Sequence, residues 1–250
     1  PIYTAGEKIS LGFKYEDLRV FIPVVGSLLA FIIFWFTWMS EKFQKRMMDK
    51  YGEDRGPANI IIYTKILGGL SMGILPALAY MIAFPETTLV DLGLGFKAET
   101  AFATIVWTLG LGAVMVFLVW NNARKPETLE HYPQIRAKNW TKKMMNGNLL
   151  GWTTYLFGYE FMFRGVLLFP LVEAIGLWPA IAVNIALYSG THIPKGQQET
   201  VGAIPLCIAL CLISVQTGNM WTAALVHIAM SYTNTLTTFK RHPEMKFLEA

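Results

Sequence analysis

Glu160 and Arg164 lie inside a stretch, residues 148–172, that is otherwise apolar enough to span a membrane. A charged side chain at bilayer depth costs about 2.5–3.5 kcal/mol on insertion scales, so such residues normally face a bundle interior and mark a site. On a helix these two are four positions apart on one face, where they can form an ion pair. Two later apolar stretches each carry one histidine, His192 and His227. Carboxylates and imidazoles are the usual general acids and bases of enzymes, so this small polar set calls for a chemical explanation.

The composition indicates that membrane helices position this set. The chain has 250 residues, of which 54% are hydrophobic and 15% charged, with a mean hydropathy of +0.40. Soluble domains usually carry about 25% charged residues. We therefore predict an all-α, polytopic transmembrane helix bundle with about seven spans. By length and polarity, these spans are 21–39, 60–83, 101–120, 148–172, 178–193, 201–217 and 220–239.

The charges between the spans predict the orientation. Lys and Arg concentrate in loops 40–59 and 121–147, whereas loop 84–100 holds Lys97 as its single basic residue. Under the positive-inside rule, the two basic loops and the C-terminus are cytoplasmic and the N-terminus is outside, in an inner or plasma membrane. The net charge of +4 is modest and sits in these loops, so nucleic acid is not expected as a partner. The expected partner is the lipid bilayer.

Three segments carry a recognisable pattern. They read YEFMFRGVLL at 159–168, YSGTH at 188–192 and TGNMWTAALVH at 217–227. The pattern resembles the CPBP family of intramembrane proteases, also called the CAAX protease and bacteriocin-processing or Abi family. Its motifs are Glu-Glu-x-x-x-Arg-Gly, Phe-x-x-x-His, and a Gly-(Ser/Asn)-hydrophobic-Trp segment leading to His-x-x-x-Asn. We expect residues 1–147 to form three spans with cytoplasmic loops, and residues 148–250 to form a four-span core resembling this family.

The resemblance implies an endopeptidase that hydrolyses peptide bonds of membrane-associated substrates with activated water. In the family pattern the first Glu and the first His, here His192, activate water with or without a metal. The second His, here His227, stabilises the oxyanion together with the Asn. The second Glu and the Arg, here Glu160 and Arg164, hold the helix of the site.

Two positions depart from the family pattern. Tyr159 replaces the first Glu, and a phenol with an ordinary pKa near 10 is mostly protonated and accepts a proton from water poorly. Ser231 replaces the Asn, although Asn234 lies seven residues after His227 on the same helical face. The alternative function is therefore a catalytically degenerate relative, a scaffold, chaperone or immunity protein that binds another membrane protein. The partner is a membrane-associated peptide substrate in the first case and a membrane protein in the second.

Several structural interpretations stay open for these residues. Glu160 and Arg164 can be a purely structural pair, His192 a residue at a span end that reaches the interface, and His227 a histidine satisfied in the core. Two histidines and a carboxylate can hold zinc, but only if Glu160 turns away from Arg164. No cofactor-binding residues are predicted, and whether a metal binds stays open. A stripe on the fifth span can line a cavity or cross-link helices; its members are Asn184, Tyr188 and His192.

Overall fold

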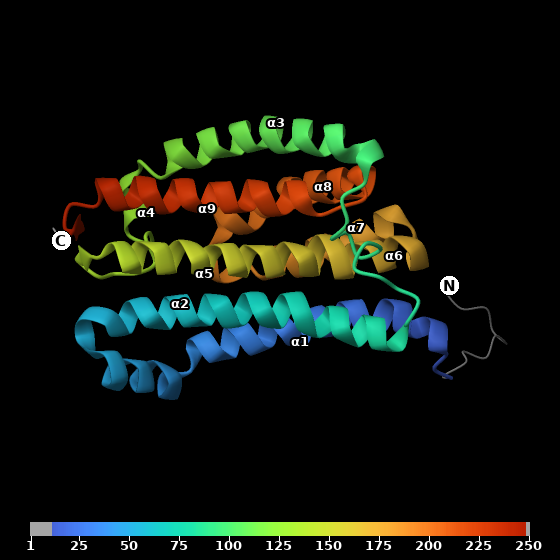
Figure 1. Cartoon of the computed structure of the whole chain (residues 1–250), viewed down its shortest axis with the longest axis horizontal. Helices are drawn as coiled ribbons and strands as arrows, with labels where there is room; N and C mark the ends of the chain where they lie inside the picture. The colour runs from blue at the N-terminus through green and yellow to red at the C-terminus, as the bar shows by residue number, and fades with distance from the viewer. Residues whose placement is uncertain (1–11, 249–250) are drawn as a thin grey trace.

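The chain folds into a bundle of long helices that run roughly along one axis (Figure 1). The computed structural model describes residues 12–248, without the side chains of Asp54 and Lys195. The two chain termini, whose sides of the membrane were predicted from the sequence, lie outside the described residues. In chain order the elements are η1 (Tyr15–Asp17), α1 (Leu18–Met39), α2 (Glu41–Ala83), α3 (Ala98–Asn122), α4 (Pro126–Leu129), β1 (Asn139–Trp140), α5 (Lys142–Glu160), the π-helical η2 (Phe161–Leu167), α6 (Leu168–Ile175), α7 (Leu177–Gly190), η3 (Ile193–Lys195), α8 (Gln197–Thr217), α9 (Trp221–Arg241) and β2 (Lys246–Phe247). The all-α bundle predicted from the sequence is confirmed.

Within residues 12–248, five helical stretches are long and apolar enough to cross a membrane. They are Tyr15–Met39, Arg55–Ala83, Ala98–Asn122, Lys142–Ile175 and Gln197–Thr217. The other two predicted spans also fold as helices, but each falls short in one property. Helix α7 has 14 residues, about 21 Å at 1.5 Å per residue, which is shorter than the hydrocarbon core of a bilayer. Helix α9 is long enough to cross but more polar than the five stretches above. The chain is an integral membrane protein, and the number of seven spans stays a prediction.

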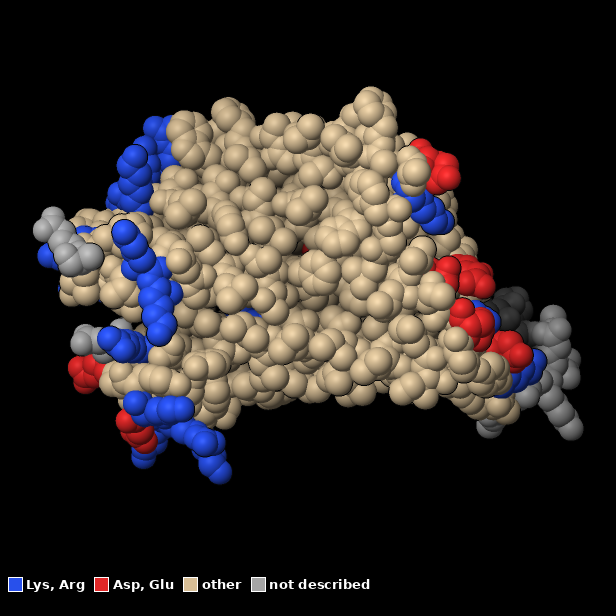
Figure 2. Space-filling view, viewed as in Figure 1, with Lys and Arg blue, Asp and Glu red and all other residues tan. Residues whose placement is uncertain are grey.

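Charged residues gather at the two ends of the bundle. On the face shown in Figure 2, Lys and Arg gather at the end where the C-terminus lies, a group of Asp and Glu lies at the opposite end, and a broad belt almost without charge separates them. This distribution is the one that the loop charges predict. A belt without charge is what a hydrocarbon layer requires, because ions are poorly solvated there.

Glycines let α2 and α5 approach closely. A Cβ on Gly158 would overlap the carbonyl oxygen of Gly69, and a Cβ on Gly69 would overlap the carbonyl oxygen of Thr154. A Cβ added to Gly73, one turn further along α2, would lie 3.2 Å from the Cα of Gly158. Small residues spaced four apart are a common way for membrane helices to gain van der Waals contact. The contact fixes the axial position of α5 just before Tyr159.

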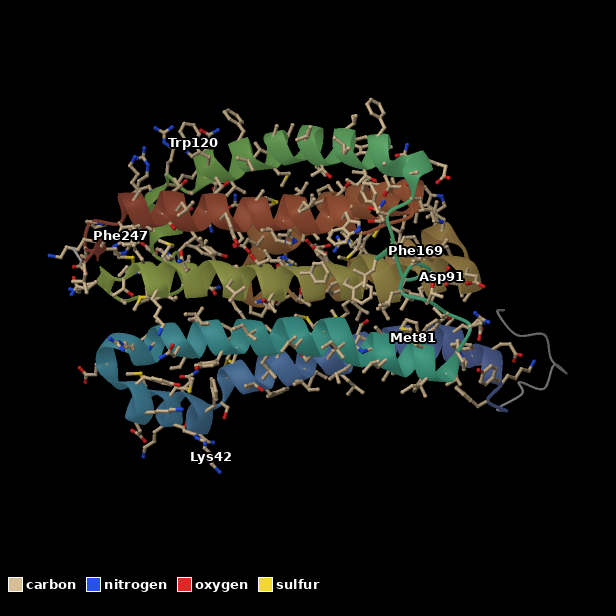
Figure 3. All side chains as sticks on the ribbon, viewed as in Figure 1. Lys42, Met81, Asp91, Trp120, Phe169 and Phe247 are labelled. Carbon is tan, nitrogen blue, oxygen red and sulfur yellow. The ribbon has the colours of Figure 1, made fainter. Side chains whose placement is uncertain are left out.

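Helix α3 lies on the outside of the bundle and is held by hydroxyl groups. Of the most apolar 18 residues of α3, only 6% are buried, against 78% for the most apolar 18 residues of the stretch Lys142–Ile175, which contains α5 and α6. Trp120 lies on its outer side, away from the other helices (Figure 3). On its inner side, threonines one turn apart bond to α8, α9 and the turn between them; the pairs are Thr100 with the Thr217 carbonyl (2.6 Å), Thr104 with Asn219 (3.0 Å) and Thr108 with Thr222 (3.1 Å). These bonds tie α3 to the half of the chain that holds the predicted site.

The loop 84–97 closes one end of the bundle over the site helices. The Met220 amide donates to the Gly93 carbonyl across 3.0 Å, and the Trp221 indole donates to the Leu94 carbonyl across 3.2 Å. Gly93 has a positive φ of 77°, and a Cβ there would strike the ring of Phe169 in α6, so glycine is required. Figure 3 shows Phe169 and this loop together at that end.

Candidate functional site

The site is built on the most buried helical stretch of the protein. Every residue from 158 to 168 is buried, across the end of α5 and through η2. Glu160 and Arg164 both have fully buried side chains, and Tyr159 is 3% exposed. The prediction that these charges face the interior of a bundle is therefore confirmed.

Within the site the helix continues as the π-helical segment η2. A π turn adds one residue to the helical repeat and alters the backbone hydrogen-bond pattern. Asn184 of α7 donates from Nδ2 to the Phe163 carbonyl in this segment across 2.7 Å. Its Oδ1 lies 3.6 Å from the Sγ of Cys207 in α8. The polar stripe predicted on α7 thus cross-links helices at this level.

Glu160 bridges two cationic or protonatable groups. Its Oε2 lies 3.0 Å from Nη1 of Arg164, and its Oε1 lies 2.6 Å from Nδ1 of His227. The Arg164 contact is an ion pair without hydrogen-bond alignment, and within residues 12–248 the guanidinium nitrogens have no hydrogen-bond acceptor. The guanidinium carbon lies 4.2 Å from the ring centroid of Tyr188, a cation–π contact that also shields the charge. The same carboxylate thus lies against Arg164 and is hydrogen-bonded to His227.

The bond to Glu160 fixes the proton on His227. An ionised carboxylate can only accept a hydrogen bond, so Nδ1 of His227 donates the hydrogen. In the neutral ring Nε2 then carries the lone pair and is the basic nitrogen. The His227 side chain keeps 17% of its surface exposed, whereas Glu160 keeps none. A buried carboxylate behind a partly exposed imidazole is the arrangement that orients a general base.

A second network holds Tyr159 and His192. Nδ1 of His192 lies 2.9 Å from the Tyr188 carbonyl, which can only accept, so Nδ1 carries the hydrogen. Thr191 also donates its hydroxyl hydrogen to the Tyr188 carbonyl, across 2.7 Å. Since Thr191 has no second hydrogen, the bond of 2.8 Å between it and the Tyr159 hydroxyl is donated by Tyr159. The hydroxyl of Tyr159 is thus hydrogen-bonded to Thr191 at the end of α7.

The two networks meet at Tyr159. Its ring centroid lies 6.1 Å from that of His227 and 5.6 Å from that of Tyr188, and the Tyr188 ring lies 4.9 Å from that of His192. The structure therefore brings Tyr159, Glu160, His192 and His227 together, and the hydrogen bond of the carboxylate goes to the second histidine.

Ser231 and Asn234 lie further along α9. The Ser231 hydroxyl, one turn after His227, is buried and has no hydrogen-bond partner within residues 12–248. Asn234 is half-buried, and its backbone carbonyl accepts from Thr238 across 2.7 Å. The assignment of these two side chains to the site stays a prediction.

The two histidines and Glu160 do not meet the condition that the sequence analysis set for a zinc site. Both oxygens of Glu160 are engaged, one by Arg164 and one by His227, so this carboxylate is not free to bind a metal ion. No group of three or more His, Cys, Asp or Glu side chains in the described part of the chain is placed to hold a metal ion. The condition set for zinc, a Glu160 turned away from Arg164, is not met.

Two residues next to the site were not singled out from the sequence. Thr191 holds Tyr159, and its position directly before His192 was the available signal. Lys65 in α2 is 5% exposed, with its ammonium 3.2 Å from the ring centroid of Trp152 and 5.0 Å from that of Tyr155. A single lysine inside the span 60–83 was the signal for that second buried charge.

Fold and site together define an integral membrane helix bundle with a buried carboxylate–histidine–arginine centre. Residues 146–233 match the family model described as Type II CAAX prenyl endopeptidase Rce1-like, over about a third of the chain. The match confirms the resemblance to the CAAX protease (CPBP) family, and it covers η2, α6 to α8 and most of α5 and α9. Neither the curated proteins nor the solved structures compared with the chain gave a match.

Proposed function

We propose that this protein is an intramembrane endopeptidase in which His227, oriented by Glu160, activates water. The observation that carries the proposal is the 2.6 Å bond between Nδ1 of His227 and Oε1 of Glu160. It leaves Nε2 of His227 as the base, with the carboxylate ready to stabilise the imidazolium that forms. The family resemblance supports peptide hydrolysis as the reaction class.

The proposed reaction moves one proton through His227. Water attacks the peptide carbonyl carbon as Nε2 of His227 takes its proton, and the carbonyl oxygen becomes an oxyanion. The unpartnered Ser231 hydroxyl, buried one turn further along α9, is the proposed donor to that oxyanion. The imidazolium then returns the proton to the leaving nitrogen as the carbon–nitrogen bond breaks.

This assignment exchanges the roles that the family pattern implies for the two histidines. In that pattern the first His works with the first Glu, but Tyr159 stands at the Glu position and its hydroxyl is bonded to Thr191. The remaining carboxylate of the site, Glu160, contacts His227 directly. The histidine with a hydrogen-bonded carboxylate behind it is the stronger candidate for the base.

The test is cleavage of membrane-anchored peptides by the full chain in nanodiscs. In heavy-oxygen water, new carboxyl termini should carry the label, as detected by mass spectrometry. His227→Ala should lower the rate by about 10²–10⁴-fold, the usual contribution of a general base. His131→Ala, a change in the loop 121–147, is the matched control and should keep the rate. Label incorporation that is the same with and without His227 would overturn the proposal, provided both variants unfold at similar temperatures.

A second candidate is a membrane-bound scaffold, and a specific observation favours it. Tyr159 stands where the family pattern has the carboxylate that activates water, and its hydroxyl is committed to Thr191. That position therefore holds a group that accepts a proton poorly. For this candidate the chain would bind another membrane protein or peptide without cleaving it. Unlabelled, intact peptide that copurifies with both the parent chain and His227→Ala would support the scaffold over the peptidase.

We also propose that the basic end of the bundle is cytoplasmic. The concentration of Lys and Arg at the end where α9 finishes supports this orientation (Figure 2). Cysteine labelling from each side of the membrane tests it with Asp91→Cys in loop 84–97 and Lys142→Cys at the start of α5. Labelling of both from one side would contradict the proposal.

A further inference from the structure

The first turns of α2 form a separate helical segment at the basic end of the protein. Gly52 has φ 72° and ψ 178°, so the chain reverses there and residues 41–51 fold back from the rest of α2 (Figure 1). The segment begins at Ser40, whose hydroxyl accepts from the Phe43 amide across 3.3 Å. Gln44 donates to the Trp38 carbonyl of α1 across 2.8 Å, which holds the segment against the end of α1.

One face of this segment is strongly basic and exposed. Its charged side chains line a hollow of about 470 Å³, and they are Lys42, Lys45, Arg46, Asp49 and Lys50. They recur three and four residues apart, so they share one helical face. Lys42 points away from the bundle (Figure 3). Four cations against one carboxylate make this hollow suited to an anionic group.

A second hollow, mostly apolar, lies directly beside the first. It is a groove of about 390 Å³ between the segment, the end of α1 and the following part of α2, and its lining is Thr37, Phe43, Arg46, Met47, Lys50, Tyr51, Tyr63 and Leu67. Arg46 and Lys50 line both hollows. Tyr63 and Leu67 leave 46% and 39% of their surfaces exposed, in a helix that is otherwise apolar enough to span. The groove therefore offers apolar surface next to a cluster of cations.

We propose that this pair of hollows binds an anionic phospholipid, with its phosphate among Lys42, Lys45, Arg46 and Lys50 and the upper part of an acyl chain in the groove. An amphipathic helix at the membrane surface with a basic face is a recurrent binding element for such lipids. The charge complements the anionic headgroup, and the groove continues from the water-exposed segment onto the span Arg55–Ala83, as a lipid does. The Glu160 site is built from other helices, so this inference does not depend on the proposed reaction.

The experiment titrates the purified full chain in detergent with phosphatidylglycerol or phosphatidylcholine and counts retained lipids by native mass spectrometry. Phosphatidylglycerol should be retained in preference to phosphatidylcholine. Changing Lys42, Lys45, Arg46 and Lys50 to Gln should weaken binding about fivefold per cation removed, which corresponds to about 1 kcal/mol for each Lys or Arg near an anionic surface. The matched control changes four other basic residues of that end to Gln and should keep the preference; they are Lys125, Lys138, Lys142 and Lys143.

Two further experiments distinguish binding of the whole lipid from binding of its headgroup alone. Leu67→Trp fills the groove and leaves the cations in place, so it should reduce retention of phosphatidylglycerol. Soluble glycerol phosphate should not displace the lipid at equal concentration, because it has no chain for the groove. Displacement by glycerol phosphate, undiminished binding in Leu67→Trp, or equal loss of binding in the control variant would each overturn the proposal.

Discussion

His227 donates its Nδ1 hydrogen to Oε1 of Glu160 across 2.6 Å, and this bond joins the middle of α9 to the end of α5. The same carboxylate holds Arg164 one turn along the helix, at 3.0 Å. Glu160 is therefore both the counter-ion of a buried guanidinium and the orienting group of an imidazole. A change at Glu160 affects stability and chemistry together, whereas a change at either partner affects mainly one of them.

The stability of this centre is expected to depend on charge balance. Glu160→Gln leaves the fully buried Arg164 without its anion and should destabilise the bundle by about 3–5 kcal/mol, as removal of one partner of a buried pair does. Combining Glu160→Gln with Arg164→Met should recover much of that loss, because no charge is then left alone. The two buried free thiols, Cys207 and Cys211, allow unfolding to be followed with a thiol-reactive dye. Additive losses in the two single variants and the double variant would argue against the pair.

Tyr159 separates the two proposed functions. Tyr159→Glu should lower activity in an enzyme that uses Tyr159, because it breaks the bond to Thr191 and sets a second carboxylate beside Glu160. Tyr159→Phe removes the same bond without adding a charge and should have a smaller effect on the cleavage rate in nanodiscs. If Tyr159→Glu instead creates or raises peptidase activity, the parent chain is the degenerate relative and the scaffold is its function.

The sequence predicted the helices of the bundle, but it did not predict which side chains are hydrogen-bonded to each other around Glu160. The spacing of Glu160 and Arg164 predicted their ion pair because both lie on one short helical stretch. The bond from Glu160 to His227 spans 67 positions and joins two different helices, a contact that the 3.6-residue repeat of a single helix does not predict. Likewise, α7 is short and α9 is polar, so hydropathy alone described them less well than α1 or α3.

The contacts of Lys65 could not be predicted from the sequence either, because its partners Trp152 and Tyr155 lie on another helix. Its ammonium sits 3.2 Å from the ring centroid of Trp152, and a cation–π contact in a desolvated site is worth about 2 kcal/mol. Trp152→Leu should therefore destabilise the bundle while Lys65 is present. With Lys65→Met in the background, which keeps the length of the side chain without its charge, the same change should have a smaller effect. A double-mutant cycle by thermal unfolding measures the coupling, and an equal effect of Trp152→Leu in both backgrounds would contradict it.

The close contact between α2 and α5 predicts an unusual response to substitution at Gly158. In an ordinary helix interior Gly→Ala is stabilising by about 0.5–1 kcal/mol, because alanine has less backbone freedom to lose. Gly110→Ala in α3 should follow this rule, since a Cβ there meets nothing within 4 Å. Gly158→Ala should reverse the sign and destabilise by about 1–3 kcal/mol, because its Cβ would overlap the carbonyl oxygen of Gly69 and push the helices apart. The displaced segment begins one residue before Tyr159, so cleavage should fall in Gly158→Ala even at temperatures where it stays folded. Equal unfolding temperatures for the two alanine variants would mean that α2 and α5 do not pack through their glycines.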